Sequence, residues 1–404
     1  EFVSGQVSRT EIGLRMGGAA AMSAGADRPR TNSSGWLRHL GLTVVSSAGA
    51  VAVALLLGAL VILASGQDPV TAYRALLSGA FGDRRSIAET LVAAAPYVLG
   101  GLAFAVAFRA GLFNIGIEGQ IVIGGLAAGL IGAADLGLPP VLFLPLALLV
   151  AALAGGLWGA IPGVLKSLSG AHEVITTIML NYLAFRLLTY VLTKTESWLP
   201  VNPQLQATEP VQPAARLPIL LERTRLHAGV IVAVLAALAL WFLLYRTTWG
   251  YRLRTVGYSR GAAAFAGFSW GRVVTGAMFV SGVLGGLAGA GETLGLHGRQ
   301  ISAPQGYGFT AIAVGLVGRN HPIGVVLSGF LFGVLRSGAT KMQNTAGTSK
   351  ELVLVLQGVI ILSVAAFASA GRLRAWWARR AQARQAPLGE ATTIGVEPGS
   401  TPPV

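Results

Sequence analysis

Apolar runs long enough to cross a lipid bilayer recur along most of the chain, separated by shorter polar connections. The first run, Val44–Ser65, would extend about 33 Å as a helix, close to the thickness of the hydrocarbon core. Further runs follow at Leu91–Phe108, Pro139–Ile161, Glu173–Thr193, Ala228–Tyr245, Val273–Gly291, Tyr307–Gly318, Ile323–Leu335 and Leu352–Ala370. Together with one interrupted stretch, they predict about ten membrane segments and an all-α polytopic membrane protein.

The interrupted stretch is Arg109–Ala134. Its second half is apolar, whereas its first half contains glycines and polar residues at Gly111, Asn114, Gly116, Glu118, Gly119 and Gln120. We expect a broken or re-entrant helix here, because irregular backbone at membrane depth is tolerated only where protein or a wet cavity surrounds it.

Four polar parts of the chain are assigned from their composition. Residues 1–40 and 372–404 have no sustained apolar run and are expected to form a disordered basic N-terminal tail and a C-terminal tail around a membrane domain at 41–371. Residues 194–227 contain five prolines and are predicted to be the largest external loop. Residues 246–272 form a basic connection between two apolar runs.

The overall composition supports a membrane protein. Hydrophobic residues make up 53% of the chain and charged residues 11%, against about 25% charged residues in soluble domains. The net charge of +14 comes from arginines in loops and tails, so it does not indicate the clustered basic face of a nucleic-acid-binding domain. Cysteine is absent and the five histidines lie far apart, so we expect no metal site and no cofactor.

The distribution of arginine predicts the orientation in the membrane. Residues 246–272 lie between two apolar runs and contain Arg246, Arg252, Arg254, Arg260 and Arg272. By the positive-inside rule this loop is cytoplasmic, and so are both termini. Its alanine-rich middle, Gly261–Gly267, favours a short helix.

Four polar residues within the apolar runs are candidates for a translocation pathway. Glu118 is a carboxylate inside an apolar run, and Asn114 and Gln120 flank it. An ionisable group within a membrane is costly and is a functional candidate by default, although a hydrogen-bonded acid that holds the broken helix together explains it as well. Asn181 lies inside Glu173–Thr193 and is expected to bond a neighbouring helix.

No catalytic constellation is present in the sequence. There is no Walker A sequence and no serine in a GxSxG setting, so we predict no catalytic residues and no ATP site of the chain's own. The protein is therefore expected not to be an enzyme.

Three stretches, taken together, resemble one protein family. They are GLFNIGIEGQ (Gly111–Gln120), EVITTIMLNYLAF (Glu173–Phe185) and AIAVGLVGRNHPIGVVLSGFLFG (Ala311–Gly333). The chain resembles, over about residues 40–370, the permease subunits of bacterial ABC importers for ribose-type sugars, branched-chain amino acids and nucleosides. It is most similar to the nucleoside (basic membrane protein-associated) branch. The resemblance implies an ABC importer permease fold in the bacterial cytoplasmic membrane and alternating access driven by a separate ATPase.

A coupling segment is also implied by this resemblance. The family pattern VGxNPxAAxYAGI corresponds here to VGYSRGAAAFAGF, Val256–Phe268. Ser259 and Arg260 replace the usual Asn-Pro, and Ser259 can still cap a helix. The resemblance implies a short helix that docks in a groove of the ATPase, with the coupling residues Gly257, Ser259, Arg260, Ala262, Ala263, Phe265, Ala266 and Gly267.

The resemblance further implies several partners. They are an ABC ATPase subunit, a second paralogous permease, an extracytoplasmic solute-binding lipoprotein near residues 194–227, and membrane lipid. The chain length of 404 residues and the size of this loop favour a heterodimer with a shorter paralogue. Two other functions stay open: an ABC permease for a sugar or another small solute, and an ion-coupled secondary transporter.

Overall fold

The computed structural model describes most of the membrane domain, namely residues 52–53, 55–194, 199–302 and 305–347 and isolated positions between 352 and 363. All of them belong to one compact unit, Val51–Val404. The expected tails, 1–40 and 372–404, lie outside the described residues. So do the beginning of the run Val44–Ser65 and most of Leu352–Ala370.

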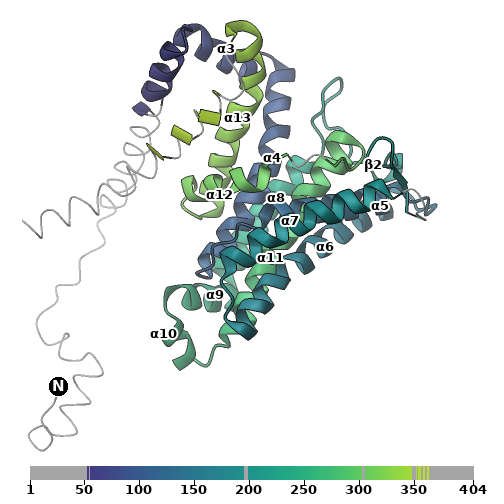
Figure 1. The fold of residues 1–404 in the computed structure, drawn as a ribbon, viewed down its shortest axis with the longest axis vertical. Helices are drawn as coiled ribbons and strands as arrows, with labels where there is room; N and C mark the ends of the chain where they lie inside the picture. The colour runs from purple at the N-terminus through teal and green to yellow at the C-terminus, as the bar shows by residue number, and fades with distance from the viewer. Residues whose placement is uncertain are drawn as a thin grey trace, which may run out of the picture. The chain divides into compact units, whose positions relative to one another are not determined.

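The described chain is helical nearly throughout (Figure 1). A short helix, Leu55–Ala64, comes first. The labelled helices are α3 (Pro69–Phe81), α4 (Arg84–Arg109), α5 (Ile117–Ala133), α6 (Pro140–Ser169), α7 (Glu173–Thr193), α8 (Gly229–Arg246), α9 (Thr248–Tyr258), α10 (Arg260–Phe265), α11 (Trp270–Ala290), the π-helix η3 (Gly291–His297), α12 (Tyr307–Val317) and α13 (Pro322–Ala346). Between α7 and α8 lie an antiparallel pair, β1 (Val201–Asn202) and β2 (Ala207–Thr208), and the 3₁₀ turn η2 (Pro213–Ala215).

The helices confirm an all-α polytopic fold. Among the described residues, six helices are long and apolar enough to cross a membrane, and three more apolar helices are shorter: Leu55–Ala64, α5 and α12. These nine follow the order of the predicted runs. The predicted break is also present, because α4 ends at Arg109 and α5 begins only at Ile117.

Three helical stretches go beyond the sequence pattern. Helix α3 forms in the connection between the runs Val44–Ser65 and Leu91–Phe108, and the Asp68 side chain accepts the N–H groups of Val70 and Thr71 at its start. Helix α13 continues past Leu335 to Ala346. The run that was expected to end at Gly291 continues as η3 to His297. The extensions of α13 and α11 contain glycines and polar residues, which end the apolar pattern before the helix ends.

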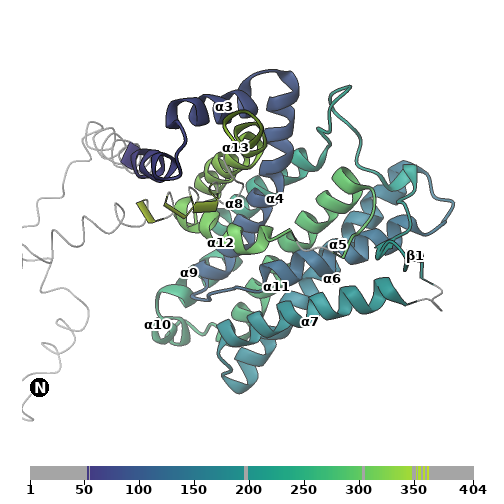
Figure 2. The same ribbon diagram turned by 45° about the horizontal axis from the view of Figure 1, so that its top comes forward.

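Glycine allows very close packing of three helices. Helices α5, α6 and α11 lie side by side (Figure 2). A Cβ at Gly286 would lie 2.2 Å from the carbonyl oxygen of Ala151, and one at Gly282 would lie 2.1 Å from that of Gly155. Helices α6 and α11 are therefore in backbone contact, a geometry that only small residues permit.

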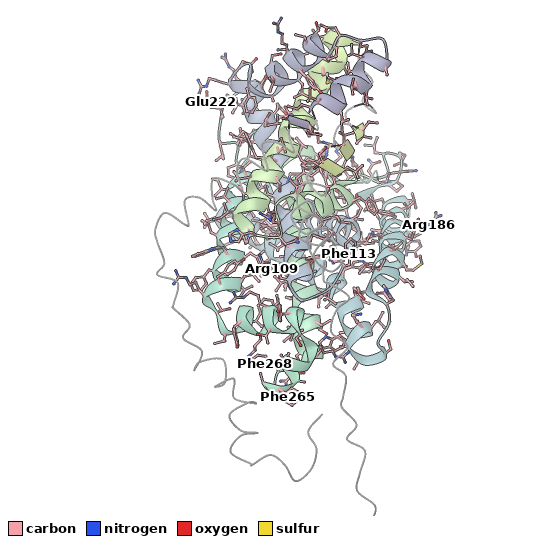
Figure 3. The ribbon with its side chains drawn as sticks, turned by 90° about the vertical axis from the view of Figure 1, so that its left-hand side faces the viewer. Arg109, Phe113, Arg186, Glu222, Phe265 and Phe268 are labelled. Carbon is pink, nitrogen blue, oxygen red and sulfur yellow. The ribbon has the colours of Figure 1, made fainter. Side chains whose placement is uncertain are left out.

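The two ends of the helical bundle differ. Helices α4, α6, α8 and α12 end, and α7, α11 and α13 begin, on the side that carries α9 and α10, which we call the α9–α10 end. There the Arg109 Nε donates to the Asn320 carbonyl (3.0 Å). Phe265 and Phe268 lie at this end and Glu222 lies far from them, near the top of the view in Figure 3. Glu222 belongs to residues 199–227, which with α3 and η3 lie at the opposite end.

Candidate functional sites

The segment from Thr247 to Gly267 folds as two short, capped helices. The Thr247 hydroxyl accepts the Gly250 N–H at the start of α9, and the Ser259 hydroxyl accepts the Ala262 N–H at the start of α10 (3.2 Å). The chain leaves α10 through Gly267, whose φ of +72° is left-handed. The predicted short helix and its serine cap are thus confirmed, with the helix covering Arg260–Phe265 instead of Gly261–Gly267.

One side of this segment is fixed to the bundle. Ala263 is fully buried, and the Arg260 guanidinium lies 4.1 Å from the centre of the Trp270 ring at the start of α11. Gly257 faces the end of α4 so closely that a Cβ would lie 2.0 Å from the Arg109 carbonyl oxygen. A displacement of α9 and α10 would therefore be transmitted to both α4 and α11.

The other side of the segment is exposed to solvent. The side chains of Phe265 and Tyr258 are 98% and 93% exposed. Ala262, Ala266 and Gly267 are exposed as well. Phe265 points away from the bundle at the lower edge of Figure 3. Exposed aromatic side chains with no internal packing role are typical anchors for a partner protein.

Basic and aromatic side chains surround the base of this segment. The guanidinium groups of Arg109 and Arg254 lie 5.6 and 5.2 Å from the centre of the Tyr245 ring. The Tyr245 ring lies 5.4 Å from that of His321. Burial and the nearby charge of Arg109 lower the pKa of His321, so this imidazole is neutral at pH 7. The positive charge here therefore comes from arginine.

Two of the predicted pathway residues hold the break between α4 and α5. The Asn114 Nδ2 donates to the Ser281 hydroxyl (2.8 Å) and its Oδ1 accepts the Gly116 N–H. The Asn181 Oδ1 accepts the Gly119 N–H (2.8 Å) and its Nδ2 donates to the Ile115 carbonyl (3.0 Å). The prediction that Asn181 bonds a neighbouring helix is confirmed.

The other two pathway residues are also buried. The Glu118 carboxylate accepts the N–H groups of Gly306 and Gly308 and so caps the start of α12. Gln120 is 1% exposed, and its Oε1 accepts a long hydrogen bond from Asn114 (3.4 Å). All four candidates therefore have partners within the protein, and Glu118 alone among them lines a described cavity. A role in contacting solute stays a prediction for each.

A cavity of about 470 Å³ lies at the opposite end of the bundle, within the range usual for small-molecule sites. Helices α3, α4, η3, α12 and α13 and the loop before α8 line it, and its lining residues include Glu292, Tyr307 and Arg336. A narrow second cavity of about 40 Å³ shares Glu292 and Tyr307 with it and reaches Glu118. The polar space thus leads from one end of the bundle towards its middle.

The base and the rim of the large cavity are both ordered by charged groups. At the base, the Arg336 guanidinium lies 4.8 Å from the centre of the Tyr307 ring and donates to the Tyr97 hydroxyl (3.4 Å). At the rim, Arg225 pairs with the Glu89 carboxylate through two nitrogens, at 2.9 and 2.5 Å. None of these residues stands out in the sequence, because they come from four separate segments that only the fold brings together.

The fold and these two sites define a class of protein, a multi-pass membrane permease with a polar cavity at one end of its bundle and a basic, partly exposed helical segment at the other. The family described as "Branched-chain amino acid transport system / permease component" matches residues 86–365, and the chain belongs to this family. The resemblance seen in the sequence motifs is confirmed.

Several curated relatives align with most of the chain. The guanosine ABC transporter permease protein NupP of Bacillus subtilis is 43% identical over 78% of this chain and 91% of its own length. The nucleoside permease NupB of Lactococcus lactis is 34% identical over 78% and 89%, and the glucose permease TsgB13 of Haloferax volcanii is 34% identical over 83% and 89%. No solved structure matches the chain.

Membership of the family has consequences for activity and partners. The relatives are permease components, and ATPase activity belongs to a separate subunit. The family therefore implies an ATPase and a substrate-binding protein as partners of this chain.

Proposed function

We propose that this chain is the permease subunit of an ABC importer that moves nucleosides across the bacterial cytoplasmic membrane. The observation that carries the proposal is its 43% identity to a guanosine permease over 91% of that protein's length. The 34% identity to a glucose permease gives a sugar importer as the second candidate. An ion-coupled secondary transporter would not explain the family match.

The distribution of charge supports an orientation for the bundle. The α9–α10 end carries Arg109, Lys166, Arg246, Arg252, Arg254, Arg260, Arg272 and Arg319. By the positive-inside rule this end faces the cytoplasm, with both termini on the same side. Residues 246–272 then form the cytoplasmic coupling loop of a membrane domain at 41–371, and residues 194–227 form the external loop. The 470 Å³ cavity faces the outside.

We propose that segment α9–α10 receives the movement of the ATPase and transmits it to the membrane helices. Phe265 and the exposed residues beside it dock in a groove of the ATPase, while Gly257, Ala263 and Arg260 pass the movement to α4 and α11. Ser259 keeps α10 in shape by capping it. Because α11 touches α6 through glycines, the two helices can repack between inward- and outward-facing states.

A second, paralogous permease completes the proposed pathway. Among the curated relatives, Bacillus subtilis and Lactococcus lactis each include a pair of guanosine or nucleoside permeases, one more similar to this chain and one less: NupP and NupQ at 43% and 28%, NupB and NupC at 34% and 27%. Such pairs favour a heterodimer in which this chain is the NupP-like member. The external loop is the proposed contact for the solute-binding lipoprotein, and exposed apolar side chains on the spans contact lipid.

The test is uptake by the reconstituted complex. Proteoliposomes with both permeases and the ATPase, supplied with binding protein, are expected to accumulate labelled guanosine only with internal ATP. Accumulation of glucose but no nucleoside would replace the nucleoside assignment with the sugar importer. Uptake by this chain alone, driven by an ion gradient, would remove the ABC mechanism.

A further inference from the structure

The large cavity ends at a carboxylate with unmet hydrogen-bonding capacity. Glu292 is 8% exposed, and its Oε2 is buried without a hydrogen-bond partner. His297 Nε2 lies 3.6 Å away, at ion-pair distance but beyond hydrogen-bonding distance, and the Tyr307 hydroxyl lies beside the carboxylate. An unsatisfied buried acceptor is costly and needs a reason, and a ligand that brings a donor is one.

The backbone around Glu292 is unusual in the same place. Residues Gly291–His297 form a π-helix, whereas α11 before them is an α-helix. π-Helical turns are rare, and they occur frequently at functional sites. Here the π-turn directs Glu292 into both cavities.

The groups around this carboxylate suit a flat, polar molecule. Tyr307 lines both cavities beside Glu292, and its ring meets that of Tyr97 edge-on at 5.3 Å. Arg336 lies against Tyr307 and lines the same cavity. The cavity therefore combines a carboxylate acceptor, a guanidinium donor and an aromatic side chain, groups that can hydrogen-bond and contact a heterocyclic base.

The charge of the cavity favours a neutral solute. Its basic and acidic side chains nearly balance: Arg85, Arg225, Arg336 and Lys341 against Asp83, Glu89 and Glu292. An acid at the base would also repel a phosphate. The cavity therefore suits a nucleoside better than a nucleotide.

The geometry points to Glu292 as the solute-recognising group of the permease, selecting nucleosides whose base presents two adjacent N–H donors, as guanine does. This assignment rests on the proposed function. A carboxylate offers acceptors only, so it pairs with the ring N–H and amino group of guanine. Adenine presents a donor beside an acceptor and leaves one pairing repulsive.

The substitution Glu292→Gln tests this chemistry directly, because an amide offers one acceptor and one donor, the complement of adenine. In the reconstituted complex, uptake of labelled guanosine should fall at least about tenfold while that of adenosine holds or rises. The control Asp135→Asn, an exposed acid between α5 and α6, should change neither. An equal loss for both nucleosides, or no change, overturns the assignment.

Two further measurements keep this test decisive. If the Glu292→Gln complex fails to assemble, Glu292→Asp replaces it in the test. This variant retains the carboxylate on a side chain that is shorter by one methylene group. It should transport more slowly but still prefer guanosine, and loss of that preference with guanosine uptake retained counts against the assignment. A wild-type complex that imports no nucleoside contradicts the proposed function itself. If the wild-type complex imports nucleosides and Glu292→Gln leaves the uptake of guanosine and adenosine unchanged, only the role of Glu292 is contradicted.

Discussion

The two ends of the bundle place their functional groups in opposite ways. At the α9–α10 end, the aromatic ring of Phe265 is almost wholly exposed on a helix that Ala263 fixes from behind. At the other end, the polar groups of Glu292 and Tyr307 are buried at the base of a cavity. A surface that binds another protein presents apolar side chains that are exposed to solvent in the free protein. A solute site instead holds polar side chains that are shielded from bulk water.

One continuous helix joins these two regions. Helix α11 begins at Trp270, against which Arg260 of α10 is stacked, and continues through η3 to Glu292. A displacement of α10 can therefore be transmitted to the cavity along a single helical element. Substitutions can perturb each end separately.

The largest effect is expected from Gly257→Val, which breaks the contact between α9 and α4. The new Cβ would lie 2.0 Å from the Arg109 carbonyl oxygen, so α9 must move away from α4. ATP-driven uptake should fall below about a tenth of wild type, because a misplacement of about 1 Å in a working geometry can cost a hundredfold.

A matched control lies four residues further on. At Gly261 the nearest atom to a new Cβ is the Ser259 hydroxyl oxygen at 3.9 Å, so Gly261→Ala should transport normally. Uptake assays on both variants make the check. Normal uptake by Gly257→Val would mean that the contact between α9 and α4 is not needed for coupling.

The next largest effect is expected from Phe265→Ala. Because this side chain is 98% exposed, its loss should leave the stability of the permease unchanged. Loss of an interface anchor costs about 2 kcal/mol or more, so the ATPase should bind roughly thirtyfold more weakly and uptake should fall with it. Phe242→Ala, on the exposed side of α8, is the control. Wild-type ATPase affinity in Phe265→Ala would remove this ring from the docking surface.

Much of this architecture is predictable from sequence, and the exceptions have physical causes. Long apolar runs, the break before Ile117 and the capped helix after Ser259 follow from local composition. Glu292 does not, because glycines around it end the apolar pattern while the helix continues as a π-turn. Arg336 and Tyr307 are unremarkable in sequence and form a site only through tertiary packing.

A smaller effect, on stability more than on transport, is expected from Glu118→Gln. The carboxylate caps α12 from a buried position, and a neutral amide keeps only one acceptor oxygen. The unfolding free energy should fall by about 1–3 kcal/mol, seen as a lower melting temperature of the purified permease in detergent. Asp68→Asn changes an exposed cap of α3 and should cost well under about 1 kcal/mol. Unchanged stability with lost uptake would instead support a direct transport role for Glu118.

The smallest effect is expected at the rim of the cavity, from Arg225→Ala. The ion pair with Glu89 is well formed, but the Arg225 side chain is 63% exposed, so water and salt screen it and the pair contributes at most about 1 kcal/mol. Uptake should change by no more than about fivefold at low salt and by less at high salt. A double-mutant cycle with Glu89→Gln, measured at two ionic strengths, separates the pair from each residue alone. A large, salt-independent coupling energy would show that the rim, like Glu292 below it, works as a buried site shielded from water.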